Sequence, residues 1–327
     1  MRRLLGAVFA ALLVAMQGGF ASLAQAQGAT KSWPQRAVRF ILPFGAGSST
    51  DIIARILGDR LQAKWGKPVV VENRPGGDGI LSITSFISSA DDHVFFFGPT
   101  SVYLVHPYTH DKLPYDATRD MGPIVRLSKT VLVQAVPASL SANNLKEFVE
   151  LARANPGKMN FGMTPGFQEF VFEGFLREQL LSVSKIPYRD IVQASTDLAE
   201  NRIQILGVAY QVVLPQLQAG KVKLLAISDR VRSDLSPETP SVVEQGFPTL
   251  ESVSMVGVYG QSSMPLALRK QIAADFLSLV ADPAIVSRMK AAGQGMDPGG
   301  PEEFAASIAE QHAQVAGIAK QLGIPRR

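Results

Sequence analysis

The sequence contains no cysteine among its 327 residues. No disulfide can therefore hold the fold and no thiol can act as a nucleophile, so burial of apolar side chains must supply the stability. Basic residues form no tract, and the formal net charge is only +4. This charge pattern gives little support for nucleic-acid binding.

Several motifs of catalytic and metal sites are also missing. The four histidines, His93, His106, His110 and His312, have no spacing typical of a metal site, and Pro107 interrupts the nearest pair. Neither a G-x-S-x-G nucleophile elbow nor a G-x-x-x-x-G-K-S/T phosphate loop occurs. We therefore expect no metal, no cofactor and no enzyme activity.

The first 26 residues have the composition of a signal peptide. Arg2 and Arg3 precede an apolar run that ends at Met16, and Ala24-Gln25-Ala26 matches an A-x-A cleavage site. The apolar run is too short to span a bilayer. We predict export, cleavage after Ala26 and a periplasmic mature protein of about 300 residues, a size at which one core splits into two.

The stretch from Val38 to Arg55 predicts a strand, a turn of small residues and a helix. Val38 to Phe44 is apolar except for Arg39, Gly45 to Thr50 are small, and apolar residues recur every three or four positions after Asp51. A helix that starts in this way leaves N–H groups unpaired and points the positive end of its dipole at them. The turn therefore favours an anion such as a carboxylate or a phosphate.

Two kinds of ligand site use this local design. A dinucleotide turn reads G-x-G-x-x-G and needs an acidic residue about 20 residues later. Gly45, Gly47 and Glu72 fit that pattern, although Thr50 replaces the third glycine. This alternative is a Rossmann-type NAD-dependent oxidoreductase. The other interpretation is an exported binding protein whose turn holds the carboxylate of a free solute, and a plain connection between strand and helix is also consistent with these residues.

Strands and helices alternate along the rest of the chain, which predicts an α/β fold with parallel sheets. Residues 113–125 look like a loop, and the chain after Pro265 looks mostly helical. We expect one lobe from residues 27–129 and 258–327 and a second from residues 130–257. Open α/β sheets bind ligands at the carboxyl ends of their strands, so turns from both lobes would face one cleft.

Two motifs together resemble those of the periplasmic substrate-binding proteins of tripartite tricarboxylate transporters, the Bug family. Pro43 to Asp51 resembles P-F-x-x-G-G-x-x-D, and Val69 to Gly77 resembles V-V-V-E-N-R-P-G-A/G. Leu113 to Asp116, Pro187-Tyr188-Arg189 and Glu244 to Pro248 resemble later landmarks in the same order. The resemblance covers the whole mature chain.

This resemblance implies a type II periplasmic-binding-protein fold without enzyme activity. Its two lobes are joined by crossing strands and close on a small organic carboxylate. The family delivers its ligand to a two-subunit integral membrane permease, and we expect this chain to do so as a monomer.

The resemblance also implies which residues bind the ligand. Amides and hydroxyls of the first loop would hold one carboxylate, and a loop of the second lobe would contact the other end. Asp51 also fits a helix cap that orients the loop amides. The second loop has few hydroxyls, which predicts a less polar distal end of the ligand. Carried over by position, the residues are Phe44, Ala46, Gly47, Ser48, Ser49 and Asp51 in the first loop, Thr164, Pro165, Gly166, Phe167 and Gln168 in the second, Tyr188 and Asp190 nearby, and Thr100 and Ser101 at the floor.

Overall fold

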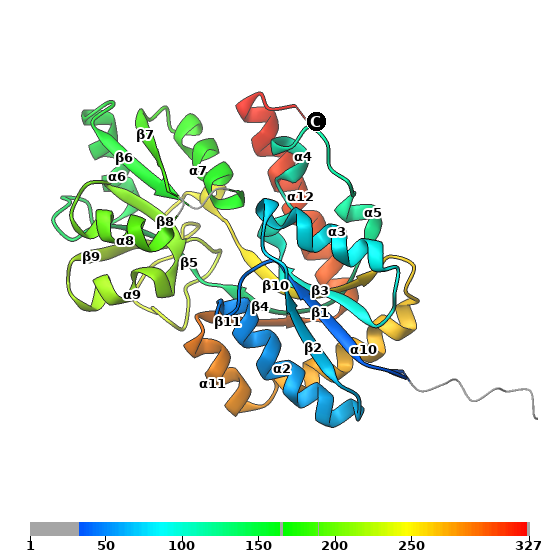
Figure 1. Ribbon diagram of the computed structural model, residues 1–327. Coiled ribbons are helices and arrows are strands. Elements are labelled where there is room, and N and C mark those ends of the chain that lie inside the picture. Colours follow the sequence, from blue (N-terminus) through cyan, green and yellow to red (C-terminus); the bar gives the residue numbers. More distant parts are fainter. Residues whose placement is uncertain (1–32, 164–165, 189, 326–327) are drawn as a thin grey trace, which may run out of the picture.

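A computed structural model describes residues 33–163, 166–188 and 190–325. The predicted signal peptide with its cleavage site, together with Thr164, Pro165 and Arg189, lies outside the described residues. The chain forms two lobes, each built on its own sheet (Figure 1). Within the described part of the chain, no helix is long and apolar enough to cross a membrane.

The first lobe contains a six-stranded sheet with the order β11-β4-β10-β3-β1-β2. Strands β3, β1 and β2 run parallel to one another, whereas β10 is antiparallel to both of its neighbours and β11 is antiparallel to β4. The strands are β1 (Val38–Leu42), β2 (Val69–Asn73), β3 (Val94–Pro99), β4 (Met121–Thr130), β10 (Ser254–Gln261) and β11 (Gln294–Gly299).

Helices cover both faces of this sheet, and β3 shows why its sequence is apolar throughout. Phe95 and Phe97 pack on one face with α2 and α10, whereas Phe96 packs on the other face with α3 and α12. A strand buried on both faces needs apolar residues at every position. The helices of this lobe are α2 (Ser49–Trp65), α3 (Ile80–Ser89), α4 (His106–Thr109), α5 (Ala117–Asp120), α10 (Leu266–Val280), α11 (Pro283–Ala291) and α12 (Pro301–Leu322), with short 3₁₀ turns η1 (Gly77–Gly79) and η2 (Thr100–Val102).

The second lobe contains a five-stranded sheet with the order β7-β6-β8-β5-β9. β6 runs parallel to β7 and β8, and β5 runs antiparallel to β8 and β9. The strands are β5 (Leu132–Pro137), β6 (Met159–Met163), β7 (Val183–Pro187), β8 (Ile205–Ala209) and β9 (Val222–Ile227). The helices are α6 (Leu145–Ala154), α7 (Phe167–Glu178), α8 (Ile191–Ala199) and α9 (Tyr210–Gln218), with the 3₁₀ turn η3 (Pro248–Leu250).

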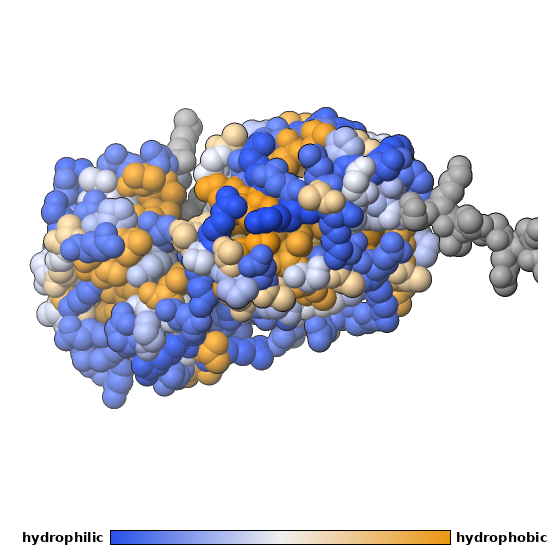
Figure 2. Space-filling view, turned by 90° about the horizontal axis from the view of Figure 1, so that it is seen from below, coloured by the Kyte–Doolittle hydropathy of each residue, from blue (hydrophilic) through white to orange (hydrophobic). Residues whose placement is uncertain are grey.

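The lobes meet where β4 leads into β5 and where β10 returns from the second lobe (Figure 1). The view from below shows two rounded bodies joined at a waist, with hydrophobic side chains on the surface of both (Figure 2). Exposed apolar side chains include Phe44 and Ile52 in the first lobe and Val192 in the second. The division of the chain at residues 130 and 257 stays a prediction.

Two sequence-based expectations need correction, and one strand was not expected. The segment 113–125 is not all loop, because its last residues belong to β4. Gly122 and Pro123 are uncommon in strands, so the sequence did not indicate a strand there. The pairing of β4 with β10 shifts register beside Pro123, which is where a strand tolerates a proline. The chain after Pro265 is mostly helical, as expected. It also contains β11, whose residues do not alternate between polar and apolar. Both sheets are mixed rather than purely parallel.

Helix α7 of the second lobe packs directly on α12 of the first. A Cβ on Gly174 would lie 2.9 Å from Ile318 Cγ2, so the missing side chain allows close approach of the two helices. Phe167, at the start of α7, is buried in the same apolar cluster as Tyr103 and Val315 of the first lobe. The lobes therefore share apolar contacts in addition to their connecting strands.

Candidate functional site

The first predicted loop connects β1 to α2. Asp51 lies in the first turn of the helix and is not the N-cap residue that the sequence suggested. Ser48 is the N-cap residue, and its hydroxyl accepts a hydrogen bond of 3.3 Å from the Asp51 amide. Gly47 has φ of +85°, a left-handed conformation that glycine adopts without strain. The loop thus turns sharply just before the helix starts.

Asp51 organises this loop from beneath it. Its carboxylate is buried and accepts hydrogen bonds from the Gly47 amide at 2.9 Å, from Asn73 Nδ2 at 2.9 Å and from Arg55 Nε at 3.1 Å. Burial alone would raise the pKa of the Asp51 carboxyl. The hydrogen bonds and the Arg55 charge outweigh that effect, and the pKa lies below its ordinary value. Asp51 is therefore an ionised anchor that orients the loop.

Two amides at the start of α2 remain available to a ligand. The Gly47 amide donates to Asp51, and the Ser48 amide donates to the Gly45 carbonyl at 3.3 Å. Within the described residues, the amides of Ser49 and Thr50 have no hydrogen-bond acceptor. First-turn amides of this kind, at the positive end of a 17-residue helix, favour a carboxylate.

The Ser49 side chain has a different role from the one predicted for its hydroxyl. Its Oγ donates to the Ala292 carbonyl at 2.8 Å and accepts from Gln294 Nε2 at 3.0 Å. The hydroxyl proton is therefore already used inside the first lobe. A ligand role for Ser49 stays a prediction, and the structure makes its amide the better candidate.

The two floor residues tie the end of β3 to the crossing strand β10. Thr100 is fully buried, and its Oγ1 accepts from the Met255 amide at 3.2 Å. Ser101 Oγ lies 2.8 Å from Ser254 Oγ, so these two hydroxyls share a hydrogen bond. Both residues lie where β3 ends, as expected, and their contact with a ligand stays a prediction.

Part of the second loop lies outside the described residues, namely Thr164 and Pro165. Gly166 follows with φ of +117° and precedes α7. The Phe167 ring is buried against first-lobe residues, whereas Gln168 Nε2 is buried and has no acceptor within the described residues. Of the described residues in this loop, Gln168 therefore offers a free polar group to a ligand.

Tyr188 and Asp190 both have partners within the second lobe. Tyr188 OH donates to Asp197 at 2.9 Å, and burial together with this carboxylate raises the pKa of Tyr188 to about 12. Asp190 caps α8 by accepting a hydrogen bond of 2.9 Å from the Val192 amide. These contacts give both residues a structural role, and their ligand role stays a prediction.

Gln211 was not foreseen from the sequence. It lies in the first turn of α9, directly after β8, and β8 runs parallel to β6. The starts of α9 and α7 therefore lie at the same edge of the second sheet. The apolar strand before Gln211 was the available signal, but no helix was expected after it.

The acidic residue of the alternative dinucleotide site, Glu72, would have to be free to bind a ribose hydroxyl. Glu72 accepts hydrogen bonds from Arg39 Nη2 at 2.8 Å and from Arg74 Nη2 at 3.1 Å. These two guanidinium groups outweigh the effect of burial and hold the pKa of the Glu72 carboxyl below its usual value. The carboxylate is thus already bound by the protein.

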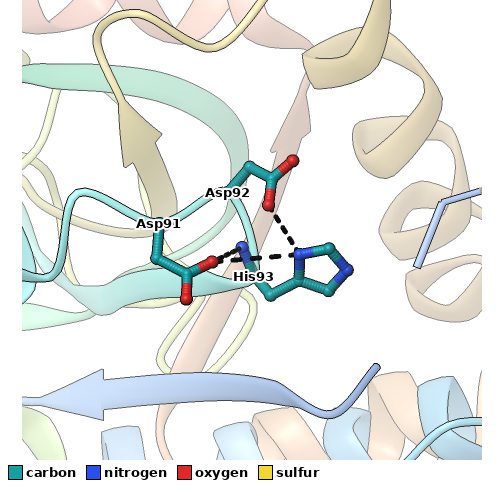
Figure 3. Close-up of side chains that lie close together, drawn as sticks. All are labelled: Asp91, Asp92 and His93. Atoms are coloured by element: carbon teal, nitrogen blue, oxygen red, sulfur yellow. Dashed lines mark hydrogen bonds and ion pairs between the residues drawn. The ribbon is translucent and has the colours of Figure 1, made fainter. Parts of the chain in front are cut away.

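Asp91, Asp92 and His93 form a compact group at the turn before β3 (Figure 3). His93 Nδ1 lies 2.6 Å from Asp92 Oδ1, and Nε2 accepts from the Gln35 amide at 3.2 Å. Both ring nitrogens are therefore engaged within the protein. Asp91 pairs with Arg36, so this group anchors the chain that enters β1.

A cavity of about 760 Å³ lies away from the predicted site, between α12, β4 and the residues around η3. None of the predicted ligand residues lines it. Its charged groups pair with one another, for example Arg126 with Asp297 and Arg230 with Glu310. The cavity is therefore distinct from the carboxylate site predicted at the start of α2.

Comparison with known proteins decides whether the chain is a binding protein or an oxidoreductase. The model of the family described as tripartite tricarboxylate transporter family receptor, TctC, matches residues 53–324. The chain belongs to this family. The predicted Bug-family resemblance is confirmed, and the chain is a periplasmic solute receptor with a two-lobed binding-protein fold. The NAD-dependent oxidoreductase alternative is wrong, because this family consists of receptors and Glu72 is held by two arginines.

Individual proteins are similar to this TctC-family receptor in sequence or structure over most of its length. A UPF0065 protein from Bordetella bronchiseptica is 30% identical over 295 residues, which cover 89% of this chain and 86% of that protein. A structure described as a periplasmic transporter has a TM-score of 0.76 at 28% identity and covers 90% of this chain and 100% of its own. An R. palustris protein solved with adipate has a TM-score of 0.76 at 23% identity, and the match covers 89% of this chain and 99% of that protein.

Proposed function

We propose that this receptor captures a small organic carboxylate between its two lobes. The observation that carries the proposal is the pair of acceptor-free amides, those of Ser49 and Thr50, at the start of α2. Asp51 holds the preceding turn, so the amides are oriented before any ligand arrives. Binding by a preorganised site avoids the free-energy cost of ordering the loop. Adipate, the ligand of the R. palustris neighbour, is a carboxylate of this class.

The ligand's other end would contact the second lobe. Gln168 offers a donor there, and Thr164, Pro165, Gly166, Tyr188 and Asp190 remain candidates from the resemblance. We further propose that the mature chain begins at Gln27, is a monomer and delivers its ligand to a two-subunit membrane permease. The signal-peptide pattern supports the start at Gln27, and the family supports delivery to a membrane transporter.

Thermal melting of the purified mature protein tests the proposed function. A ligand present at 100 times its dissociation constant stabilises the folded state by about 2.7 kcal/mol. We expect a clear rise in melting temperature with at least one member of a panel of mono-, di- and tricarboxylates. Amides of the same acids and NAD serve as matched controls and should have no effect. Stabilisation by NAD and by none of the acids would contradict the proposal, and native mass spectrometry of gently purified protein would identify a co-purifying acid.

A further inference from the structure

Gln211 places a polar group of the second lobe beside the predicted carboxylate site. Its Nε2 donates to the Ala292 carbonyl, which also accepts the hydroxyl proton of Ser49. Ser49 and Gln211 therefore share one acceptor, although they belong to different lobes. The Gln211 amide lies close to the first turn of α2 for this reason.

Gly293 makes this position of Gln211 possible. A Cβ on Gly293 would overlap the Gln211 amide, and Gly293 has φ of +75°, which glycine tolerates. The Ala292 carbonyl also fixes the orientation of the amide, because exchange of its oxygen and nitrogen would bring two acceptors together. Gln211 Oε1 is thereby held as a buried acceptor, and no donor reaches it within the described residues.

The unpaired polar groups at the starts of α2, α7 and α9 indicate which atoms a ligand that contacts them would carry. Ser49 and Thr50 amides and Gln168 Nε2 are donors, so they match oxygen atoms of an acid. Gln211 Oε1 is an acceptor, and an ionised carboxylate has no proton to give it. Leaving a buried acceptor without a partner costs about 1–3 kcal/mol. A ligand that covers Gln211 Oε1 without donating a hydrogen bond to it therefore binds with a less favourable free energy.

We propose that Gln211 is a ligand contact that selects carboxylates bearing a hydrogen-bond donor, a hydroxyl or an ammonium group, near the carboxylate bound by α2. This inference rests on the proposed function. It goes beyond it by naming a residue of the second lobe and a chemical feature of the ligand.

Titration calorimetry with matched acids tests the inference on the mature protein. Malate and aspartate are each compared with succinate, and citrate with tricarballylate, because each pair differs at a hydroxyl or ammonium group. For at least one pair we expect the donor-bearing acid to bind at least about fivefold more tightly. Gln211→Met, which keeps the length but removes the acceptor, should reduce this preference to within about twofold, mainly by weakening the donor-bearing acid.

Gln218→Met, an exposed change on the same helix, is the control and should keep the preference. Equal binding within every pair, or equal weakening of both members by Gln211→Met, would overturn the role of Gln211 while the proposed function stands. Failure of the wild-type protein to bind any of these acids, or any acid of the melting panel, would contradict the proposed function itself. Unchanged melting temperatures of both variants without ligand would show that the fold is intact.

Discussion

At the scale of single residues, one buried carboxylate prepares the carboxylate site. Asp51 binds the turn, the helix and β2 at once through Gly47, Arg55 and Asn73. The sequence predicts the turn of small residues before the helix, because such a turn depends on neighbouring residues, but it suggests Asp51 as the cap where the structure has Ser48. It does not predict the bond of Ser49 to Ala292, whose positions are 243 residues apart. A hydroxyl in a binding loop is therefore not always a hydroxyl for the ligand.

Two substitutions at Ser49 separate the role of its amide from that of its hydroxyl. Ser49→Ala removes the hydroxyl and should change carboxylate affinity less than threefold, because that hydroxyl is bound within the protein. Ser49→Pro also removes the amide proton at the first helical position, where proline is well tolerated. We expect it to weaken binding about tenfold or more, since a hydrogen bond to a charged group is lost.

Titration calorimetry of both variants with the acid that stabilises the protein most would measure this difference. Melting temperatures without ligand provide the control for folding. Equal affinities of Ser49→Ala and Ser49→Pro would show that the Ser49 amide does not bind the acid.

At the scale of elements, local patterns predict the strands and helices that are buried on regular faces. The four residues of β3 from Val94 to Phe97 are apolar without a break, and the Asn144 side chain caps α6 through the Glu147 amide. Strands β4 and β11 are not predicted from local patterns. β4 is a strand because it pairs with β10, and β11 because it pairs with β4, whereas their own composition does not indicate strands. The contact of α7 with α12 is not predicted from local patterns either, since it joins segments far apart in the sequence.

Gly174 tests the close packing of α7 on α12. Gly174→Ala should lower the free energy of unfolding by about 1 kcal/mol or more, because the new methyl group would collide with Ile318. In an Ile318→Ala background the same change should instead stabilise by up to about 1 kcal/mol, because alanine favours the helix and the obstacle is gone. Urea unfolding of the four proteins in this cycle measures both effects. The same sign in both backgrounds would contradict the packing described for these helices.

His106 in α4 gives the segment after β3 a predicted pH dependence. Burial, aided by the charge of His110, lowers the pKa of His106 to about 4, and its Nδ1 lies 2.6 Å from Tyr115 OH. The unfolded chain has a histidine pKa of about 6.5, so it binds more protons than the folded chain between pH 6.5 and 4. Stability therefore falls as the pH drops through this window.

The matching measurement is urea unfolding of wild type and His106→Gln at several pH values. Between pH 7 and 4 the free energy of unfolding of the wild type should fall by up to about 3 kcal/mol more than that of the variant, which has no titrating group at position 106. Parallel pH profiles for the two proteins would show that His106 titrates normally in the fold.

At the scale of the whole molecule, two lobes bring separate helix starts to one place. The sequence predicts the two-lobed fold because the chain contains two series of alternating strands and helices. It does not predict how α2 and α9 meet, since Ala292 and Gly293 lie in neither helix and join Ser49 to Gln211 only in the folded chain. The local sequence pattern therefore identifies the loop at the start of α2, whereas only the folded structure shows that Gln211 of the second lobe lies beside it.

The most direct measurement is a titration of deuterated, ¹⁵N-labelled mature protein with the acid that stabilises it most, followed by the backbone amide signals. If the carboxylate binds at the start of α2, the amides of Ser49 and Thr50 should show the largest downfield shifts, and these should saturate with the calorimetric affinity. Unchanged signals for Ser49 and Thr50, with the main shifts around Gln311 and Gln314 in the cavity beside α12, would contradict the account.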